Sequence, residues 1–157
     1  MRIGIGYDAH RLTPGETLYL GGVLIPYEKG LSGVSDADVL LHAIMDALLG
    51  AAAMGDIGVH FPPSDKSYKG IRSTELLKRT LDIISDYKII NIDSVITAQE
   101  PHLSGYIYEM RQTVAAICGL PEDCVSIKAT TTERMGFEGR GEGISAQAVC
   151  IIEKNNF

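Results

Sequence analysis

Asp8, His10 and His42 carry side chains of the kinds that bind zinc in proteins. One residue separates Asp8 from His10, so on a β-strand both side chains point to the same side of the sheet. His42 lies in an apolar stretch with helical spacing, and its imidazole would complete a three-ligand site with one open position for water or a substrate oxygen. The alternative is that all three are solvated residues, at a strand end and on a helix face.

A second polar tract, Lys128-Ala129-Thr130-Thr131-Thr132-Glu133, supplies three hydroxyls and one carboxylate in a row. Hydroxyls and backbone amides suit phosphate oxygens, and the carboxylate of Glu133 suits a Mg²⁺ ion shared with phosphates. The glycine-rich stretch at 136–143 lacks the pattern of a P-loop. A polar strand end is the usual explanation of a threonine run, and a hairpin turn explains the glycines about as well.

Two further segments combine polar groups with turns. Residues 56–58 and 61–65 place a carboxylate and exposed amides in a Gly/Pro loop, and loops of this length often carry function. Residues 98–104 leave an expected strand and enter an expected helix, a geometry that can present backbone donors and acceptors to a flat base. Helix termination and a plain linker are the alternatives, and we expect His60 and His102 to lie on the surface.

The elements that must position these residues follow from hydrophobic periodicity. Ile3, Ile5 and Tyr7 alternate with other residues, which predicts a strand over 2–9 with Asp8 and His10 on the opposite face. The other expected elements are a hairpin or bulged strand over 17–25, a helix capped by Ser35 or Asp36 and running to about Ala53, a helix from near Ser73 to about Asp86, a strand over 90–98, a helix over 104–118 capped by Gly119, a strand over 125–129 and a final strand over 144–153.

Asp38, His42 and Asp46 recur every four residues and form a polar stripe along the first helix. Beside an apolar stripe, such a polar stripe needs either solvent or a ligand. Strands and helices alternate without a strict βαβ order. We therefore expect one α+β domain over residues 1–157, with helices covering one face of a sheet.

Composition limits the classes of partner. A net charge of −6 argues against a nucleic-acid or anionic-membrane surface, so an anionic ligand would have to be attracted locally. The first residues contain no apolar core long enough for a signal peptide, which favours the cytosol. Cys118, Cys124 and Cys150 are odd in number and form no C-x-x-C motif, so we interpret them as core thiols.

Taken together, five motifs in order resemble the 2-C-methyl-D-erythritol 2,4-cyclodiphosphate synthase family. They span almost the whole chain: Gly-Tyr-Asp-Ala-His-Arg at 6–11, Ser-Asp-Ala-Asp-Val-Leu-Leu-His-Ala at 35–43, Gly-Asp-Ile-Gly at 55–58, Lys-Ala-Thr-Thr-Thr-Glu at 128–133 and Gly-Phe-Glu-Gly-Arg-Gly-Glu-Gly-Ile at 136–144. The resemblance makes the metal interpretation the favoured one.

The resemblance implies a homotrimer with active sites at subunit boundaries. It also implies conversion of 4-diphosphocytidyl-2-C-methyl-D-erythritol 2-phosphate to the cyclic diphosphate and CMP, a step of non-mevalonate isoprenoid synthesis. Asp8, His10 and His42 would bind Zn²⁺, and Glu133 would bind Mg²⁺ or Mn²⁺ between the α- and β-phosphates. Thr131 would donate a hydrogen bond as charge shifts, and amides near Ser35, at a helix start, would hold the attacking phosphate.

The resemblance further implies which residues contact the substrate. Asp56 and Gly58 would contact the methylerythritol part, residues 98–104 with 130–132 would form a cytidine and phosphate pocket from a neighbouring subunit, and Phe137 and Arg140 would lie toward the trimer axis. The full implied set is Asp8, Ala9, His10, Ser35, Asp56, Ile57, Gly58, Phe61, Pro62, Pro63, Ser64, Asp65, Ala98, Gln99, Glu100, Pro101, His102, Leu103, Ser104, Thr130, Thr132, Glu133, Phe137 and Arg140.

Two positions depart from the family pattern. Val34 stands where the family usually has a histidine that helps to stabilise the transition state, and Pro63 replaces a common carboxylate. One alternative is therefore an impaired or non-catalytic diphosphate-binding homologue. Another is a zinc-dependent hydrolase, for which Asp38 and Asp46 are the candidate bases.

Overall fold

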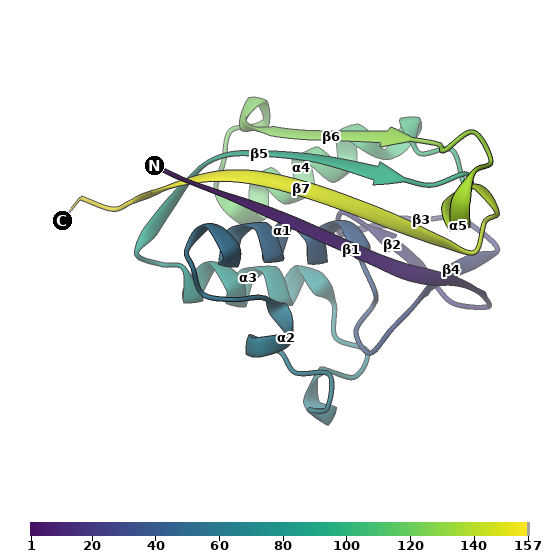
Figure 1. Ribbon diagram of the computed structural model, residues 1–157, viewed down its shortest axis with the longest axis horizontal. Helices are drawn as coiled ribbons and strands as arrows, with labels where there is room; N and C mark the ends of the chain where they lie inside the picture. The colour runs from purple at the N-terminus through teal and green to yellow at the C-terminus, as the bar shows by residue number, and fades with distance from the viewer. Residues whose placement is uncertain (157) are drawn as a thin grey trace.

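The computed structural model describes residues 1–156 and contains one five-stranded sheet (Figure 1). The strand order is β4-β1-β7-β5-β6, with β5 and β6 parallel and the other neighbours antiparallel. The strands are β1 (Arg2–Pro14), β4 (Lys29–Ser32), β5 (Tyr87–Thr97), β6 (Val125–Thr130) and β7 (Gly143–Lys154). A separate hairpin pairs β2 (Leu18–Leu20) with β3 (Val23–Ile25).

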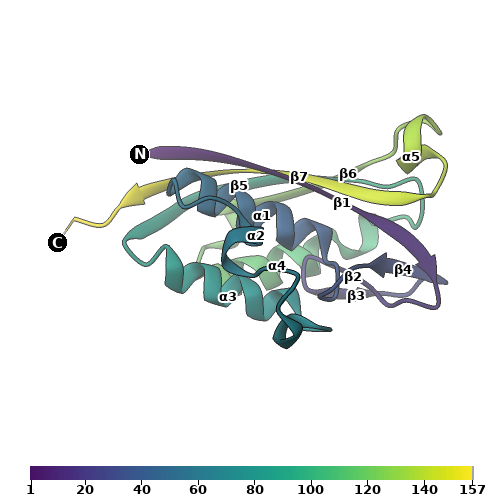
Figure 2. The ribbon, with the colours of Figure 1, turned by 60° about the horizontal axis from the view of Figure 1, so that its bottom comes forward.

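The longer helices all lie on one face of the sheet (Figure 2). They are α1 (Val39–Ala51), α3 (Ser73–Ile83) and α4 (Ile107–Cys118). Two short helices, α2 (Ile57–His60) and α5 (Gly136–Gly139), and three 3₁₀ turns (Lys66–Tyr68, Ser104–Tyr106 and Glu122–Cys124) complete the elements. The expected α+β class with helices on one face is confirmed, whereas the domain limits of 1–157 stay a prediction.

Helix α1 lies unusually close to β1 because Gly4 and Gly6 face it. A Cβ atom added at Gly6 would lie 1.9 Å from the backbone oxygen of Ala43, and one added at Gly4 would lie 1.9 Å from that of Ala47. Glycine is the residue that permits such an approach of two backbones. Because Asp8 and His10 continue the glycine face of β1, the same contact brings them next to α1.

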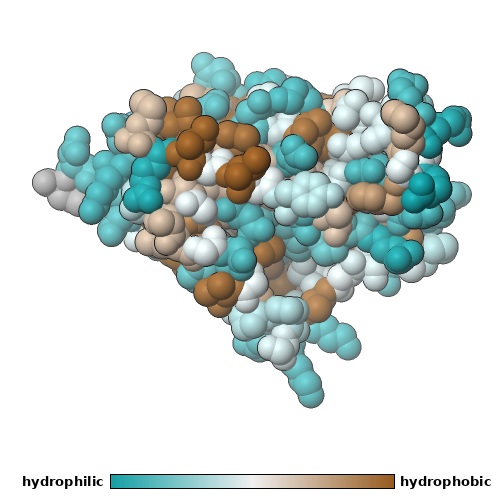
Figure 3. All heavy atoms as spheres, in the orientation of Figure 1, coloured by the Kyte–Doolittle hydropathy of each residue, from teal (hydrophilic) through white to brown (hydrophobic). Residues whose placement is uncertain are grey.

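The opposite face of β1 exposes large apolar side chains. Ile3 and Ile5 are each 71% exposed and Tyr7 is 54% exposed. Figure 3 shows a brown apolar patch over the N-terminal half of β1. The alternation that predicted this strand is therefore correct, but its apolar residues point away from the core and its glycines point inward.

The expected cap of the first helix is wrong. Asp38, not Ser35 or Asp36, is the N-cap, and its side chain accepts from Leu41 N. Ser35 and Asp36 instead accept hydrogen bonds from the backbone two residues on, Ala37 N and Asp38 N, which forms turns before the helix. The amides around Ser35 therefore do not form a helix start.

The expected polar stripe on α1 is also only partly correct. Asp38 is completely buried, and besides capping α1 it accepts hydrogen bonds from Gly21 N (3.0 Å) and Gly22 N (2.7 Å) in the β2–β3 turn. Asp46 accepts from Ile57 N at 2.8 Å and fixes the start of α2. Backbone donors therefore hold both carboxylates, and the fully buried one of Asp38 meets neither solvent nor the cavity.

Several boundaries differ from the expected ones by a few residues. β1 continues past residue 9 to Pro14, α3 ends at Ile83 rather than Asp86, β5 begins at Tyr87, and the helix expected from Ser104 starts with a 3₁₀ turn. Gly119 ends α4 in the left-handed conformation (φ 65°), as expected. The glycine-rich stretch forms α5 rather than only a hairpin turn.

The three cysteines are free and differ in burial. Cys150 is buried, whereas Cys118 and Cys124 are half-buried, so the core-thiol interpretation holds fully for Cys150 alone. Burial raises the pKa of Cys118 to about 12 and that of Cys150 to about 11, which keeps both as thiols. Within residues 1–156, no helix has both the length and the apolar character needed to cross a membrane.

Candidate metal centre

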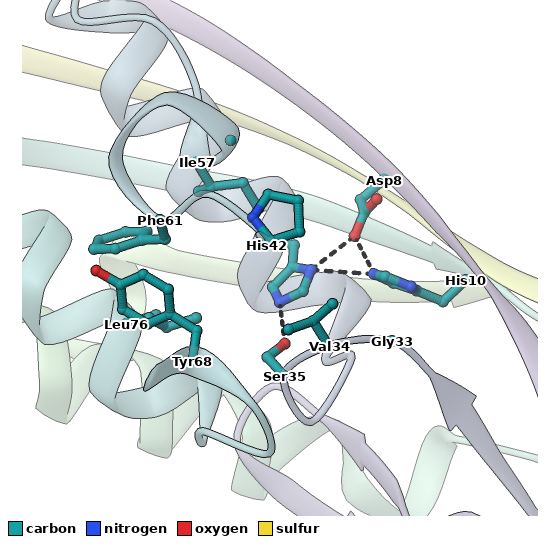
Figure 4. Close-up of a pocket in the computed structure, with 12 residues that line it drawn as sticks. Asp8, His10, Gly33, Val34, Ser35, His42, Ile57, Phe61, Tyr68 and Leu76 are labelled. Carbon is teal, nitrogen blue, oxygen red and sulfur yellow. Dashed lines mark hydrogen bonds and ion pairs between the residues drawn. The ribbon is translucent and has the colours of Figure 1, made fainter. Parts of the chain in front are cut away.

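Three possible metal ligands converge where β1 lies against α1 (Figure 4). Asp8 Oδ2 is 2.8 Å from His10 Nε2 and 2.9 Å from His42 Nδ1, and the two ring nitrogens are 3.1 Å apart. Ligands at 2.0–2.1 Å from a tetrahedral zinc ion are themselves roughly 3.3 Å apart. The three atoms thus form one triangular face of such a site after a small expansion, which fits zinc.

The outer nitrogens of both imidazoles have polar partners. His10 Nδ1 lies 3.1 Å from the carbonyl oxygen of Ser32, which can only accept, so Nδ1 carries the hydrogen and a neutral ring keeps a lone pair on Nε2. His42 Nε2 lies 3.0 Å from Ser73 Oγ and 3.2 Å from Ser35 Oγ. Such outer contacts commonly orient metal-binding histidines.

The electrostatics of the cluster favour a charged carboxylate. Burial alone would raise the pKa of Asp8, but hydrogen bonds and charge from His10 and His42 outweigh it and hold that pKa well below its usual range. Burial alone would lower the pKa of His10, yet the hydrogen bond and charge of Asp8 raise it. A divalent cation would take over the role that the imidazole protons play toward Asp8.

The cluster lines a cavity of about 370 Å³ whose other walls are mainly apolar. The lining contains nine of the residues singled out in the sequence: Asp8, His10, Val34, Ser35, His42, Ile57, Gly58, Phe61 and Pro63. Asp56 instead caps α2 by accepting from Val59 N. Pro62, Ser64 and Asp65 are in the adjoining loop but are not among the lining residues.

Sequence reasoning missed five residues around this cavity. Gly33, Tyr68 and Leu76 line it, and the Tyr68 ring packs edge-on against Phe61 at 5.7 Å between ring centroids. Ser73 and Asp36 lie behind His42. Asp36 is within the motif at 35–43 but is expected there only as a helix cap, and no local motif marks the other four, which come to this region from the loop before α1, a 3₁₀ turn and α3.

The segment 98–104 and the end of β6 together form a second cavity, of about 230 Å³. Its walls are Ala98, Gln99, Pro101, His102, Leu103, Ser104, Ile107, Ala129, Thr130 and Thr131, none of which lines the first cavity. The structure therefore brings residues 98–104 to the threonine tract but places both apart from the metal cluster within one subunit. Glu100, Thr132 and Glu133 are not among the lining residues of this cavity.

The loop after β6 is held in an uncommon conformation. Glu133 (φ 52°) and Arg134 (φ 64°) lie in the left-handed region, which residues with side chains rarely adopt. Hydrogen bonds from Glu133 N to Thr131 Oγ1 (3.3 Å) and from Arg134 N to Gln99 Oε1 (3.0 Å) support it. Glu133 is exposed, and in the sequence it follows Thr131, a wall residue of the second cavity, by two positions.

The remaining predicted residues lie near the glycine-rich segment and in loops. Ala9 and Phe137 line a third cavity, of about 200 Å³, which His10 also borders. Arg140 is exposed and pairs with Glu142, at 2.8 Å between Nε and Oε1. His102 is exposed as expected, but His60 is half-buried, with Nε2 2.7 Å from Met54 O.

Comparisons with known proteins agree over nearly the whole chain. A family model described as the YgbB family matches residues 1–153. The 2-C-methyl-D-erythritol 2,4-cyclodiphosphate synthase of Moorella thermoacetica is 58% identical over 154 residues, which cover 97% of this chain and 94% of that protein. The synthase of the same name from Syntrophomonas wolfei is 57% identical over 156 residues, covering 98% and 99%. A solved structure of a 2C-methyl-D-erythritol-2,4-cyclodiphosphate synthase with bound CDP is 33% identical, with a TM-score of 0.89, and the match covers 97% of this chain and all of that one.

Proposed function

The chain belongs to the YgbB family, and from this membership we propose that it converts 4-diphosphocytidyl-2-C-methyl-D-erythritol 2-phosphate to 2-C-methyl-D-erythritol 2,4-cyclodiphosphate and CMP. This reaction belongs to non-mevalonate isoprenoid biosynthesis, and we expect it to take place in the cytoplasm. The observation that carries the proposal is the convergence of Asp8, His10 and His42 on the wall of a cavity large enough for a small organic ligand.

The chemistry asks for positioning more than for a nucleophile from the protein. A phosphate of the substrate attacks the β-phosphorus of the same molecule and CMP leaves, so the reacting groups are already tethered. Asp8, His10 and His42 would hold Zn²⁺, and Glu133 would hold Mg²⁺ or Mn²⁺. These ions would supply Lewis acidity and neutralise phosphate charge.

The chain's own residues have separate tasks in this proposal. Apolar side chains around the first cavity, such as Ile57 and Phe61, would pack against the methylerythritol part and exclude water. Thr131 would donate a hydrogen bond to the diphosphate as charge shifts toward the leaving group. Gln99 and residues 101–104 line the second cavity, which supports the cytidine as its occupant because a homologous structure binds CDP.

A homotrimer with active sites between subunits is part of the proposal. Two observations support it: Ile3, Ile5 and Tyr7 expose an apolar sheet face, and the two halves of the expected site form separate cavities in one subunit. A second subunit could bring its second cavity to the first cavity of its neighbour. Sedimentation or light scattering of the purified protein would show three copies.

The two-subunit site can be tested by complementation. His42→Ala would disable the metal half and Thr131→Ala the nucleotide half, so each variant alone should be inactive or nearly so. If one site draws its halves from two subunits, co-refolded mixtures should regain part of the activity, because some interfaces join two intact halves. Activity that never exceeds the sum of the two variants would contradict a shared site.

The activity itself is tested by release of CMP from the cytidyl substrate with Zn²⁺ and Mg²⁺ present. His42→Ala should abolish zinc retention, while Glu133→Gln should leave zinc bound and weaken the Mg²⁺ dependence. A zinc-loaded trimer that releases no CMP would overturn the enzymatic proposal and favour a diphosphate-binding homologue. Val34 makes this alternative specific, because it lines the cavity at 43% exposure and offers no hydrogen-bond donor from its side chain.

The hydrolase alternative loses its candidate bases. Burial, together with the charge of Asp36, raises the pKa of Asp38 to about 6, a value that would suit a base. The carboxylate is nevertheless fully buried among backbone N–H groups and does not line the cavity. Asp46 is likewise bonded to the start of α2. Neither side chain is placed to activate water beside the metal cluster.

A further inference from the structure

His42 is connected to a buried carboxylate through one hydroxyl. Its Nε2 lies 3.0 Å from Ser73 Oγ, and Ser73 Oγ donates in turn to Asp36 Oδ1. Ser73 is completely buried, and the Asp36 side chain is only 5% exposed. Neither residue lines the cavity that contains the metal cluster, so the link from Asp36 through Ser73 to His42 serves another purpose than binding substrate.

Asp36 is held firmly as an acceptor. Its Oδ2 accepts from Arg72 Nε at 3.1 Å and from the backbone N of Ser73 at 2.9 Å, while its Oδ1 also accepts from Asp38 N at 3.1 Å. Arg72 is itself fixed, because its guanidinium stacks 3.9 Å over the Tyr19 ring and donates to Gly22 O. The carboxylate therefore meets donors on both oxygens and keeps its orientation.

The direction of the hydrogen bonds then follows from counting hydrogens. A serine hydroxyl has one hydrogen, and Ser73 gives it to Asp36, so toward His42 the oxygen can only accept. His42 Nε2 must then carry the ring hydrogen, and a neutral imidazole keeps its lone pair on Nδ1. Nδ1 is the atom that faces Asp8 and His10.

The opposite tautomer has a competing attraction. Asp8 Oδ2 lies 2.9 Å from His42 Nδ1 and would accept a hydrogen from it, which would occupy the nitrogen that a metal needs. Ser35 Oγ, 3.2 Å from Nε2, has a hydroxyl that can donate or accept, so it does not decide between the tautomers. Among these contacts, only the one with Ser73 favours hydrogen on Nε2 and opposes the pull of Asp8.

We propose that Asp36 and Ser73 are positioning residues that set the tautomer of His42 and so keep its Nδ1 ready to bind a metal ion. This inference rests on the proposed zinc site. It explains why a serine from α3 and a carboxylate from the loop before α1 meet behind His42. In the sequence, Ser73 is 31 positions from His42 and Asp36 is 6 positions from it.

Two substitutions test the proposal in different ways. Ser73→Ala removes the acceptor, so Asp8 should draw the hydrogen to Nδ1. Asp36→Asn is nearly isosteric, and its carboxamide should turn its oxygen to Arg72 and Ser73 N and its NH₂ to Ser73 Oγ, at the cost of the hydrogen bond from Asp38 N. The hydroxyl hydrogen of Ser73 would then point to His42 Nε2, which reverses the relay with every side chain in place. Thr80→Val is the matched control, since it removes another completely buried hydroxyl of α3, whose one partner among residues 1–156 is Leu76 O.

Two measurements read the outcome. Correlation spectra of the ¹⁵N-labelled, metal-free protein, at a pH where both imidazoles are neutral, identify which His42 nitrogen carries hydrogen. Competition with a chromogenic chelator gives the zinc Kd. Wild type and Thr80→Val should show hydrogen on Nε2, whereas both test variants should shift it to Nδ1 and weaken zinc binding roughly 10- to 100-fold, as for other outer partners of metal ligands.

Folded test variants that keep hydrogen on Nε2 and the wild-type zinc Kd would overturn the proposal. Weaker zinc binding without a change of tautomer would also overturn it, because the two residues would then only support the fold. If the wild-type protein bound no zinc, the metal part of the proposed function would fail, and the tautomer in the metal-free spectra would still test the role of Ser73 and Asp36 separately.

Discussion

Gly6→Ala is the substitution that most directly tests how the fold builds the metal cluster. The new Cβ would lie 1.9 Å from Ala43 O, 2.8 Å from Ala47 N and 2.9 Å from Ala43 C, all in the backbone of α1. Ordinary contact begins at 3.4 Å, so β1 and α1 would have to separate by up to 1.5 Å, the difference between 3.4 and 1.9 Å. No flexible side chain can give way in their place.

This separation acts directly on the ligands, because Asp8 follows Gly6 on β1 and His42 precedes Ala43 on α1. A shift of that size along the line between Asp8 Oδ2 and His42 Nδ1 would lengthen their 2.9 Å separation toward 4.4 Å. A tetrahedral zinc ion requires roughly 3.3 Å. We therefore expect Gly6→Ala to lose zinc, and we expect the overpacking to cost about 1–3 kcal/mol of stability.

The assay is zinc content by elemental analysis after dialysis, together with thermal unfolding. For a chain of this size the expected cost corresponds to a fall in Tm of roughly 2–12 °C. Gly50→Ala is the control on the same helix, because its Cβ would meet nothing nearer than Ile5 O at 3.9 Å, and it should be neutral or slightly stabilising. A folded Gly6→Ala protein with one tightly bound zinc per subunit would refute this account of the site.

Three further predictions follow from single side chains. Asp38→Asn should lower the free energy of unfolding by about 1–3 kcal/mol in denaturant titrations. The carboxylate now accepts hydrogen bonds from three backbone N–H groups, and the NH₂ group of the asparagine would leave one of them without an acceptor. Val34→His should raise the rate of CMP release, by up to roughly 10²- to 10³-fold if the missing donor limits turnover; an unchanged high rate would mean that the valine is compensated. Zinc binding should weaken as pH falls through the His10 pKa, which Asp8 raises against the effect of burial, because the ring must lose its proton to bind metal. Calorimetry in buffers of different ionisation enthalpy should show proton release on zinc binding at that pH and little release at higher pH.

Sequence reasoning succeeded where spacing along one element contains the information. The i, i+2 pair of Asp8 and His10 needs only the period of a strand, and the helix around His42 is marked by its apolar spacing. The ordered motifs indicated the family without any coordinates. The assignments of Thr131 and Glu133 to catalysis and metal binding stay predictions, because they depend on a second subunit.

Sequence reasoning failed where a residue's role is set by a partner far away in the chain. Asp38 had the spacing of a ligand or a solvated residue, but the turn at Gly21 and Gly22 folds over it and makes it a buried cap. The alternation of Ile3 and Ile5 predicted a strand but not which of its faces meets the helix, and the close approach of α1 to the glycine face leaves both isoleucines exposed.

The sequence by itself determined which atoms can bind a metal and which elements carry them, because residue type and local periodicity are properties of short segments. Only the tertiary structure decided which nitrogen of His42 is free for the metal. That choice depends on Ser73, 31 positions away, and on the carboxylate behind it. Hydrogen-bond direction is a property of the assembled network, so no pattern within one segment can specify it.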